Sequence, residues 1–219
     1  MTSHRPRLLD LFCGAGGAAR GYQLAGFHVT GIDHRPQPRY VGDKFVLGDA
    51  LEYLAQHGAE FDAIHASPPC QAYSSMVSLY PDRHYPRLIP PLRAVLDELG
   101  KPYVIENVER AKPEMPNALT LCGTMFGLRV RRHRLFQCSP PIYFPPASCR
   151  HWLKTAKQGR RPDPEKEFIC ITGRFSGQDY ARRAMQIHWM RRTELTQAIP
   201  PAYTEWIGLQ LLAAIRHLP

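Results

Sequence analysis

Residues 8–17 read LLDLFCGAGG, a short apolar run that ends in a glycine-rich turn. Helical character follows at once, from Ala18 to Ala25. Glycines between a strand and a helix let the backbone approach a ligand closely and present amide groups at the helix N-terminus. This junction predicts the first strand and helix of a ligand-binding sheet, and further strands must support it.

Apolar runs of strand length recur along the chain, and helical stretches separate them. The runs lie at 8–12, 29–32, 61–66 and 103–108, and the helical stretches at 18–25, 50–57 and 88–99. Strands that alternate with helices indicate a parallel sheet covered on both faces, with ligands at the carboxyl ends of the strands. We therefore expect an α/β fold with a doubly wound, mostly parallel sheet.

The regular pattern fails after about Gln137. Residues 139–167 contain SPPIYFPPAS and many Arg and Lys residues, which is typical of an extended, mobile, basic insertion. A final helix is expected from Tyr203 to Arg216, after two prolines. We therefore divide the chain into a core at 1–137, a small basic region at 138–190 and a segment at 191–219 that returns to the core.

The charge of the chain is uneven. The formal net charge is +9, yet residues 1–109 hold 10 Lys and Arg against 12 Asp and Glu, and residues 110–219 hold 18 against 7. A basic half is typical of a polyanion-binding surface, and a solvated basic face is the alternative. The sequence shows neither an apolar run of membrane-spanning length nor a signal peptide, so we expect a cytoplasmic protein with reduced cysteines.

Acidic residues follow successive predicted strands. Asp33 ends the second strand and can accept hydrogen bonds from both hydroxyls of a ribose. Asp49 falls where the next strand should end and could reach an adenine. A helix cap is the alternative for each carboxylate. Their order, one per strand end, favours a nucleoside cofactor.

The run at 61–67 leads directly into PPCQAYS at 68–74. Two prolines fix the backbone, so Cys70 should project from the strand end beside the cofactor as a nucleophile. The other five cysteines are expected to be packing residues. The next strand delivers Glu106 at its end, where shielding from water would raise the pKa of the carboxyl group and let it act as an acid. A helix cap or a salt bridge is the alternative for Glu106.

The ordered motifs DLFCGAGG, PPCQ, ENV and RRHRLF resemble those of the DNA (cytosine-5) methyltransferases, over roughly residues 7–137. The resemblance implies a Rossmann-like fold that binds S-adenosylmethionine and releases S-adenosylhomocysteine. It implies that Cys70 adds to carbon 6 of a cytosine flipped out of DNA, while Glu106 supports protonation at ring nitrogen 3. By the same resemblance, Arg134 contacts the cytosine carbonyl oxygen and Arg132 supports the site.

The resemblance also assigns residues to binding surfaces. The cofactor-binding set is Phe12, Gly14, Ala15, Gly16, Gly17, Asp33, His34, Asp49, Ala50, Pro68 and Gln197. Gln197 stands where the family normally has Asn, so donor binding is altered in detail and a modified donor stays open. The expected nucleic-acid contacts are Gln71, Ser74, Arg150, Lys154, Arg160 and Arg161. Because the recognition region is short, we expect the protein to recognise a short or loosely specified sequence in double-stranded DNA. We also expect a monomer.

Two other functions stay open. One is cytosine-5 methylation of RNA, since one branch that resembles this family modifies transfer RNA. The other is a catalytically silent module that binds cofactor and DNA, although Cys70, Glu106 and Arg134 all stand intact. A zinc ion could gather Cys138, Cys149, His151 and Cys170, but their spacing fits no standard pattern, and we therefore expect no metal site.

Overall fold

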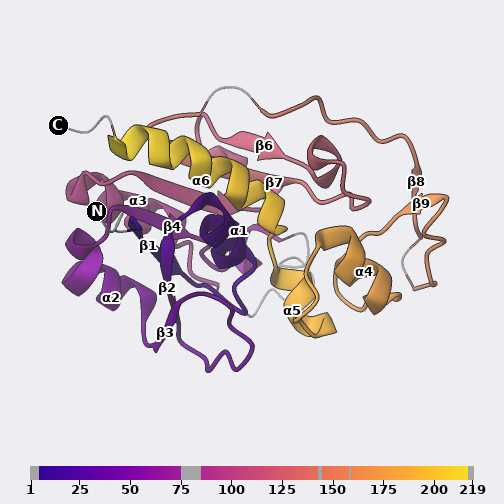
Figure 1. Cartoon of the computed structure of the whole chain (residues 1–219), viewed down its shortest axis with the longest axis horizontal. Helices are drawn as coiled ribbons and strands as arrows, with labels where there is room; N and C mark the ends of the chain where they lie inside the picture. The colour runs from indigo at the N-terminus through magenta and orange to yellow at the C-terminus, as the bar shows by residue number, and fades with distance from the viewer. Residues whose placement is uncertain (1–4, 75–84, 143–144, 158, 217–219) are drawn as a thin grey trace.

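The computed structural model describes residues 5–74, 85–142, 145–157 and 159–216. Within these residues, a seven-stranded sheet has the order β3-β2-β1-β4-β5-β7-β6 (Figure 1). The strands are β1 (Arg7–Leu11), β2 (His28–Asp33), β3 (Lys44–Leu47), β4 (Ala63–Ala66), β5 (Tyr103–Asn107), β6 (Leu119–Leu121) and β7 (Arg134–Ser139). Neighbouring strands from β3 to β5 pair in parallel, and β7 is antiparallel to both β5 and β6.

Helices cover both faces of the sheet, which confirms the doubly wound fold. On one face lie α1 (Gly17–Ala25) and α6 (Pro201–Arg216), and on the other lie α2 (Ala50–His57) and α3 (Ile89–Leu99). Successive residues of β1 point to opposite faces, so Leu8 joins the core under α1 and α6 while Leu9 joins the core under α2 and α3. The near-continuous apolar character of β1 and β4 follows from this double burial.

Helices α1 and α6 pack in close contact. A Cβ atom at Gly21 would lie 2.1 Å from the carbonyl oxygen of Pro201, so only glycine permits this approach. The hydroxyl of Thr204 donates to the carbonyl of Ala18 at 2.9 Å, which fixes the two helices in register. This contact holds the chain that precedes α6 against the glycine-rich turn at the start of α1.

The region after β7 contains more regular structure than the sequence indicates. Two-residue strands β8 (Lys154–Thr155) and β9 (Glu167–Phe168) form a separate small sheet. Helices α4 (Gln178–Met185) and α5 (Arg192–Gln197) follow, and neither was predicted. Short 3-10 turns also occur: η1 (Gly58–Glu60), η2 (Gln71–Tyr73), η4 (Glu109–Glu114) and η5 (Gly123–Phe126). None of the helices in the described ranges has both the length and the apolar character that crossing a membrane requires.

Replacing Gly21 with alanine is expected to destabilise the fold, because the new methyl group would force α1 and α6 apart. Overpacking of this kind costs about 1–3 kcal/mol. That loss corresponds to a fall in Tm of roughly 2–4 °C per kcal/mol for a chain of this size. Thermal unfolding followed by circular dichroism measures it. Arg20→Ala, on the exposed side of the same helix, is the matched control, and equal Tm values for Gly21→Ala and the unsubstituted chain would contradict the prediction.

Candidate active site

A cavity of about 370 Å³ lies at the carboxyl ends of β1, β2 and β4. This is the point where the strand order reverses, the usual ligand site of such sheets. Its volume lies within the range of roughly 300–1,000 Å³ that is common for small-molecule sites. Of the residues expected to bind a cofactor, those that line this cavity are Phe12, Gly14, Ala15, Gly17, Asp33, His34 and Gln197.

The remaining expected cofactor residues lie outside this lining. Gly16 adopts a left-handed conformation, with φ 82°, directly before α1. The side chain of Asp49 accepts hydrogen bonds from the amides of Leu51 and Glu52, both at 2.9 Å, and thereby caps α2. Ala50 begins that helix. For Asp49 the helix-cap alternative therefore describes what its carboxylate does, and its contact with an adenine stays a prediction, as do the roles of Gly16, Ala50 and Pro68.

Asp33 is buried and held in a fixed orientation. Its carboxylate accepts hydrogen bonds from the amide of Gly14 and the amide of Arg35, each at 3.0 Å. Nδ1 of His34 lies 3.4 Å from Oδ1 of the same carboxylate. Because a carboxylate can accept about four hydrogen bonds, Asp33 keeps capacity for a ligand. The glycine turn and the β2 end are thus joined through the side chain that was expected to hold a ribose.

Asp10 also lines the cavity, and the sequence analysis assigned it no role. Its side chain is buried, and neither carboxylate oxygen has a hydrogen-bond partner of normal geometry among the described residues. Burial and the negative charge of Asp33 raise the pKa of Asp10 well above its usual value, although the backbone of Ala19 partly offsets them. An acidic residue inside an otherwise apolar strand is the signal that could have identified it. Such a carboxylate can accept hydrogen bonds from a ligand.

The chain around α5 closes one side of the cavity. Arg39 forms a bidentate ion pair with Glu194, with nitrogen–oxygen distances of 2.7 and 2.9 Å. The indole of Trp189 donates to the carbonyl of Ala15 at 2.9 Å, which ties this segment to the glycine turn. The segment at 191–219 was expected to return to the core, and its residue Gln197 lies in the cavity wall.

Cys70 lies at the end of a short loop that leaves β4. Its neighbours Pro69 and Gln71 line the cavity, and the thiol itself is half-buried. Asn107 is buried, and its amide donates to the carbonyl of Pro68 at 2.9 Å. The motif ENV included Asn107, but its role in holding the proline loop was not predicted. This hydrogen bond fixes the position from which Cys70 projects.

Glu106 and Arg134 form an ion pair beside this loop, with Nε of Arg134 3.2 Å from Oε1 of Glu106. Burial raises the pKa of Glu106, and the charge of Arg134 works in the opposite direction. Burial and the charge of Glu106 likewise raise the pKa of Cys70, against the positive charges of Arg134 and Arg132. The groups expected to perform chemistry therefore lie within electrostatic reach of one another.

A buried hydrogen-bonded chain lies behind Glu106. Tyr22 and Ser67 contact the two ring nitrogens of His65, each at 2.9 Å. Burial lowers the pKa of His65 to about 3, so its ring is neutral. A hydrogen bond from Ser67 acts to lower the pKa of Glu106. The network therefore connects α1 to the candidate acid, which the sequence did not indicate.

Arg132 is buried outside the cavity lining, and its side chain bonds to the backbone of two other segments. Its guanidinium donates to the carbonyl of Ile171 at 2.9 Å and to the carbonyl of Thr196 at 2.8 Å. Tyr203 of α6 in turn donates to the carbonyl of Arg132 at 2.6 Å. One buried side chain thus joins the start of β7 to the basic region and to α5.

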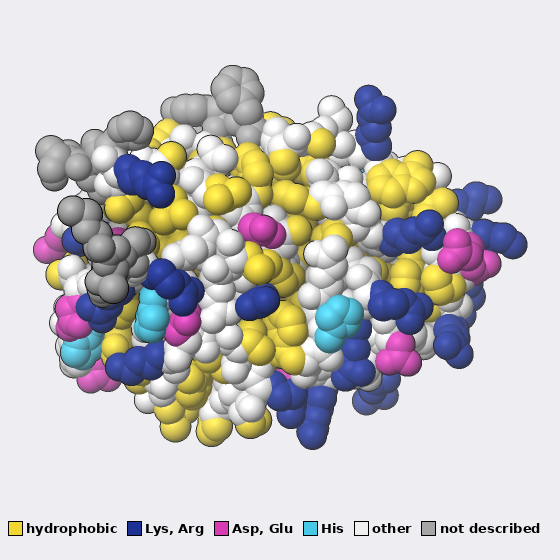
Figure 2. Space-filling model, in the orientation of Figure 1, with side chains coloured by type: hydrophobic (Ala, Val, Ile, Leu, Met, Phe, Trp, Pro, Cys, Tyr) yellow, Lys and Arg dark blue, Asp and Glu magenta, His cyan; other side chains and the backbone are white. Residues whose placement is uncertain are grey.

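The residues expected to contact nucleic acid lie in two places. Gln71 lines the cavity and Ser74 follows it on the same loop. Arg150, Lys154 and Arg161 are exposed, and Arg160 is exposed but forms an ion pair with Glu167. Figure 2 shows Lys and Arg side chains gathered at the end of the molecule that β8, β9 and α4 form. The charge asymmetry of the sequence therefore corresponds to one end of the fold.

Comparisons with known proteins show which sequences and folds this chain resembles. No protein-family model matches the chain. The type II methyltransferase M.AgeI of Thalassovita gelatinovora is 28% identical over 118 residues, which cover 47% of this chain and 28% of that protein. The chain is therefore similar to a type II methyltransferase over about half of its own length.

Solved structures show the fold shared with other methyltransferases. A prophage-encoded E. coli protein, assigned as a DNA modification methyltransferase, superposes with a TM-score of 0.61 at 15% identity, covering 97% of this chain and 100% of that one. The S. pombe Dnmt2 methyltransferase gives 0.61 at 14% identity, with coverage of 96% and 99%. The Entamoeba histolytica methyltransferase EhMeth gives 0.62 at 12% identity, with coverage of 97% and 99%. The expected Rossmann-like methyltransferase fold is therefore confirmed.

Replacing Asp10 with asparagine is expected to stabilise the ligand-free protein near neutral pH. Because the pKa of Asp10 is raised in the folded state, the unfolded chain loses this proton first, and stability falls as pH rises from about 4. Asp10→Asn removes that loss, so its advantage should be about 1–3 kcal/mol at pH 7 and should vanish below about pH 4. Urea unfolding across this pH range measures it.

Glu98→Gln, at an exposed position of α3, is the matched control and should leave the pH dependence of stability unchanged. An Asp10→Asn variant that is less stable than the unsubstituted chain at pH 7 would contradict the assignment of an uncompensated buried carboxylate.

Proposed function

We propose that this chain transfers the methyl group of S-adenosylmethionine to carbon 5 of cytosine in DNA, with Cys70 as the nucleophile. The observation that supports this most is the placement of Cys70 between two cavity-lining residues, next to the ion pair of Glu106 and Arg134. A thiol, a shielded acid and a cation beside a donor-sized cavity are the groups that this reaction requires.

The residues of the cavity fit a sulfonium nucleoside. Asp33 would accept hydrogen bonds from the ribose hydroxyls, and the amides at the glycine turn would face the amino-acid end of the donor. The carboxylate oxygens of Asp10 have no hydrogen-bond partner among the described residues, and they would accept hydrogen bonds from an ammonium group or a hydroxyl of the donor. Gln197 in the cavity wall would contact the donor where the family has Asn. When bound, the donor supplies an electrophilic methyl group for carbon 5.

The residues around Cys70 would carry the acceptor chemistry. The Cys70 thiolate forms a bond to carbon 6 of the extruded base while Glu106 gives a proton to ring nitrogen 3, which makes carbon 5 nucleophilic. After methyl transfer, a base removes the proton from carbon 5, the electron pair forms the bond between carbons 5 and 6, and the bond to the Cys70 sulfur breaks. The proton on ring nitrogen 3 returns to Glu106, which restores the neutral base and the acid. Arg134 would hold the cytosine carbonyl oxygen while paired with Glu106.

The proposed acceptor is DNA. The relative M.AgeI is named a type II methyltransferase, and the E. coli prophage protein is assigned as a DNA modification methyltransferase. The exposed Arg150, Lys154 and Arg161 would contact phosphates near the flipped base. RNA is the second candidate acceptor, because a basic surface attracts either polyanion and the catalytic groups act on the base alone.

Incubation with S-adenosylmethionine and DNA that contains 5-fluorocytosine is expected to trap a covalent complex, because fluorine cannot leave carbon 5 as a proton does. Denaturing gel electrophoresis with radiolabelled methyl donor measures the trapping. The same substitution in RNA distinguishes the two acceptors. Cys70→Ala should abolish both trapping and turnover.

Cys170→Ala, which replaces an equally half-buried thiol away from the cavity, is the matched control and should trap normally. Trapping that persists in Cys70→Ala would remove Cys70 from the nucleophilic role. Trapping on RNA alone would overturn the choice of DNA.

Glu106→Gln is expected to lower turnover by about 10²–10⁴-fold, the usual contribution of a general acid, while donor binding by calorimetry changes little. An unchanged turnover rate in Glu106→Gln would refute the role of Glu106 as the acid.

Ser67→Ala removes a hydrogen bond that lowers the pKa of Glu106, so the pKa of Glu106 should rise further. Because protonated Glu106 is the proposed active form, the high-pH limb of turnover at saturating donor should then move to higher pH.

A further inference from the structure

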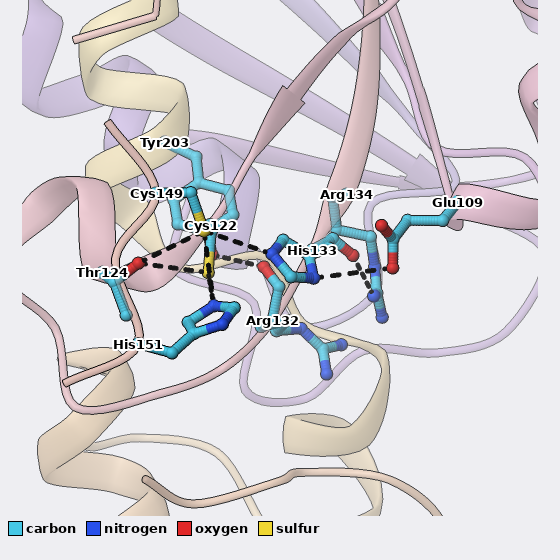
Figure 3. Close-up of polar contacts among 9 residues, drawn as sticks. All are labelled: Glu109, Cys122, Thr124, Arg132, His133, Arg134, Cys149, His151 and Tyr203. Carbon is cyan, nitrogen blue, oxygen red and sulfur yellow. Dashed lines mark hydrogen bonds and ion pairs between the residues drawn. The ribbon is translucent and has the colours of Figure 1, made fainter. Parts of the chain in front are cut away.

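Four metal-binding side chains converge outside the cavity. Cys122 lies at the end of β6, His133 directly precedes β7, and Cys149 and His151 come from the basic region. One ligand atom from each residue lies within 4.8 Å of all the others. Figure 3 shows the four side chains pointing toward a common centre. Segments that are distant in the sequence therefore meet here through side chains of only two kinds, thiol and imidazole.

Three sulfur–nitrogen distances within this group match the edges of a tetrahedral metal site. Nε2 of His151 lies 3.3 Å from Sγ of Cys149 and 3.6 Å from Sγ of Cys122, and Nε2 of His133 lies 3.4 Å from Sγ of Cys149. A tetrahedron with Zn–S bonds of about 2.3 Å and Zn–N bonds of about 2.0 Å has sulfur–nitrogen edges of about 3.5 Å.

Hydrogen bonding alone does not account for the arrangement. Nε2 of His151 carries either one proton or one lone pair, yet it faces two sulfur atoms at once. Cys149 in turn faces the Nε2 atoms of both histidines. A cation at the centre would interact with all four ligand atoms together, and two thiolates would neutralise a divalent charge.

Groups around the four residues would complete such a site. Nδ1 of His133 lies 3.5 Å from a carboxylate oxygen of Glu109, so the ring can present its other nitrogen to a metal. A carboxylate that holds the far nitrogen of a ligating histidine is a recurrent feature of zinc sites. The hydroxyl of Thr124 lies 3.5 Å from Sγ of Cys122 and 3.6 Å from Sγ of Cys149, where it can donate to a thiolate.

We propose that Cys122, His133, Cys149 and His151 bind one structural Zn²⁺ ion. Two thiolates and two imidazoles form a closed ligand set that favours zinc over magnesium or calcium, which prefer oxygen. The site departs from the sequence expectation of no metal. Its residues also differ from the four that the sequence analysis considered for zinc, because Cys138 and Cys170 are not among them. Cys138 lies within β7, and the thiol of Cys170 contacts the hydroxyl of Thr172.

The proposed site would join the basic region to the catalytic core. His133 stands between Arg132 and Arg134, so a metal bond at His133 would restrain the start of β7, from which Arg134 reaches Glu106. Cys149 and His151 flank Arg150, an expected phosphate contact. The ion would therefore hold a nucleic-acid contact at a fixed place relative to the candidate active site.

Metal analysis of the reduced, purified full chain tests the proposal. After dialysis against metal-free buffer, inductively coupled plasma mass spectrometry should find about one zinc per chain. Replacement by Co²⁺ should give the visible absorption of a tetrahedral ion and a sulfur-to-cobalt charge-transfer band. Because both thiols release protons on binding, the affinity for Zn²⁺ should fall as pH falls.

Exposed ligands allow variants that spare the core. Cys149→Ser and His151→Ala should each weaken Zn²⁺ binding by more than about 100-fold, and Cys149→Ser should also diminish the charge-transfer band. Cys170→Ser, in the same region but outside the site, is the matched control and should bind normally. Glu109→Gln should weaken binding by about 10–100-fold, as outer-shell partners do.

Circular dichroism of each variant verifies that it is folded before metal is measured. A reduced, folded chain that binds no Zn²⁺ overturns the proposal. So does a folded Cys149→Ser or His151→Ala variant that binds Zn²⁺ as tightly as Cys170→Ser. Loss of zinc from both ligand variants, with retention by the control, supports it. These readouts do not depend on methyl transfer, so they stay informative even if the proposed reaction is wrong.

Discussion

Parallel hydrogen bonding of β1 with β2 and β4, and of β4 with β5, places four strand ends at one edge of the sheet. Three groups of the candidate active site depend on this arrangement. Asp33 ends β2, the loop that carries Cys70 leaves β4, and Glu106 lies near the end of β5. If any of these strands ran in the opposite direction, its residue would emerge at the far edge of the sheet. The chemistry is thus brought together by backbone pairing, before any side chain contacts another.

Several acidic side chains lie together at this buried edge of the sheet, which has an electrostatic cost. They differ in how many hydrogen-bond and ion-pair partners offset that cost. Glu106 has Arg134 at 3.2 Å and Asp33 has two backbone amides, whereas Asp10 has no hydrogen-bond partner of normal geometry in the described part of the chain. Buried polar groups normally have hydrogen-bond partners. An exception beside a cavity indicates where a ligand would contribute its own donors. Asp10 is therefore the position at which the proposed donor would add hydrogen bonds that the described residues do not supply.

Local sequence patterns were sufficient to predict the sheet and the candidate catalytic groups. The helix predicted at 50–57 is α2, and the strand ends that carry Asp33 and Glu106 were predicted from apolar runs bounded by turn residues. Features that arise from tertiary contact were not predictable in this way. The role of Asn107 requires knowing that the carbonyl of Pro68 lies beside it, and the gathering of Cys122 with His151 requires knowing how the basic region folds back. Helix α4 was missed because its sequence is polar and contains two arginines, and helix α5 was missed because it is only six residues long.

The contact between α1 and α6 joins the second structural element of the fold to one that begins at Pro201. Contacts between such distant segments slow folding, because a long loop must close before they can form. During translation, α1 emerges long before its partner helix, and its apolar face stays without that cover. The cavity wall at 190–199 is also absent at that stage. A ribosome-bound intermediate would therefore carry an incomplete candidate site and exposed apolar surface, which is typical of aggregation-prone intermediates.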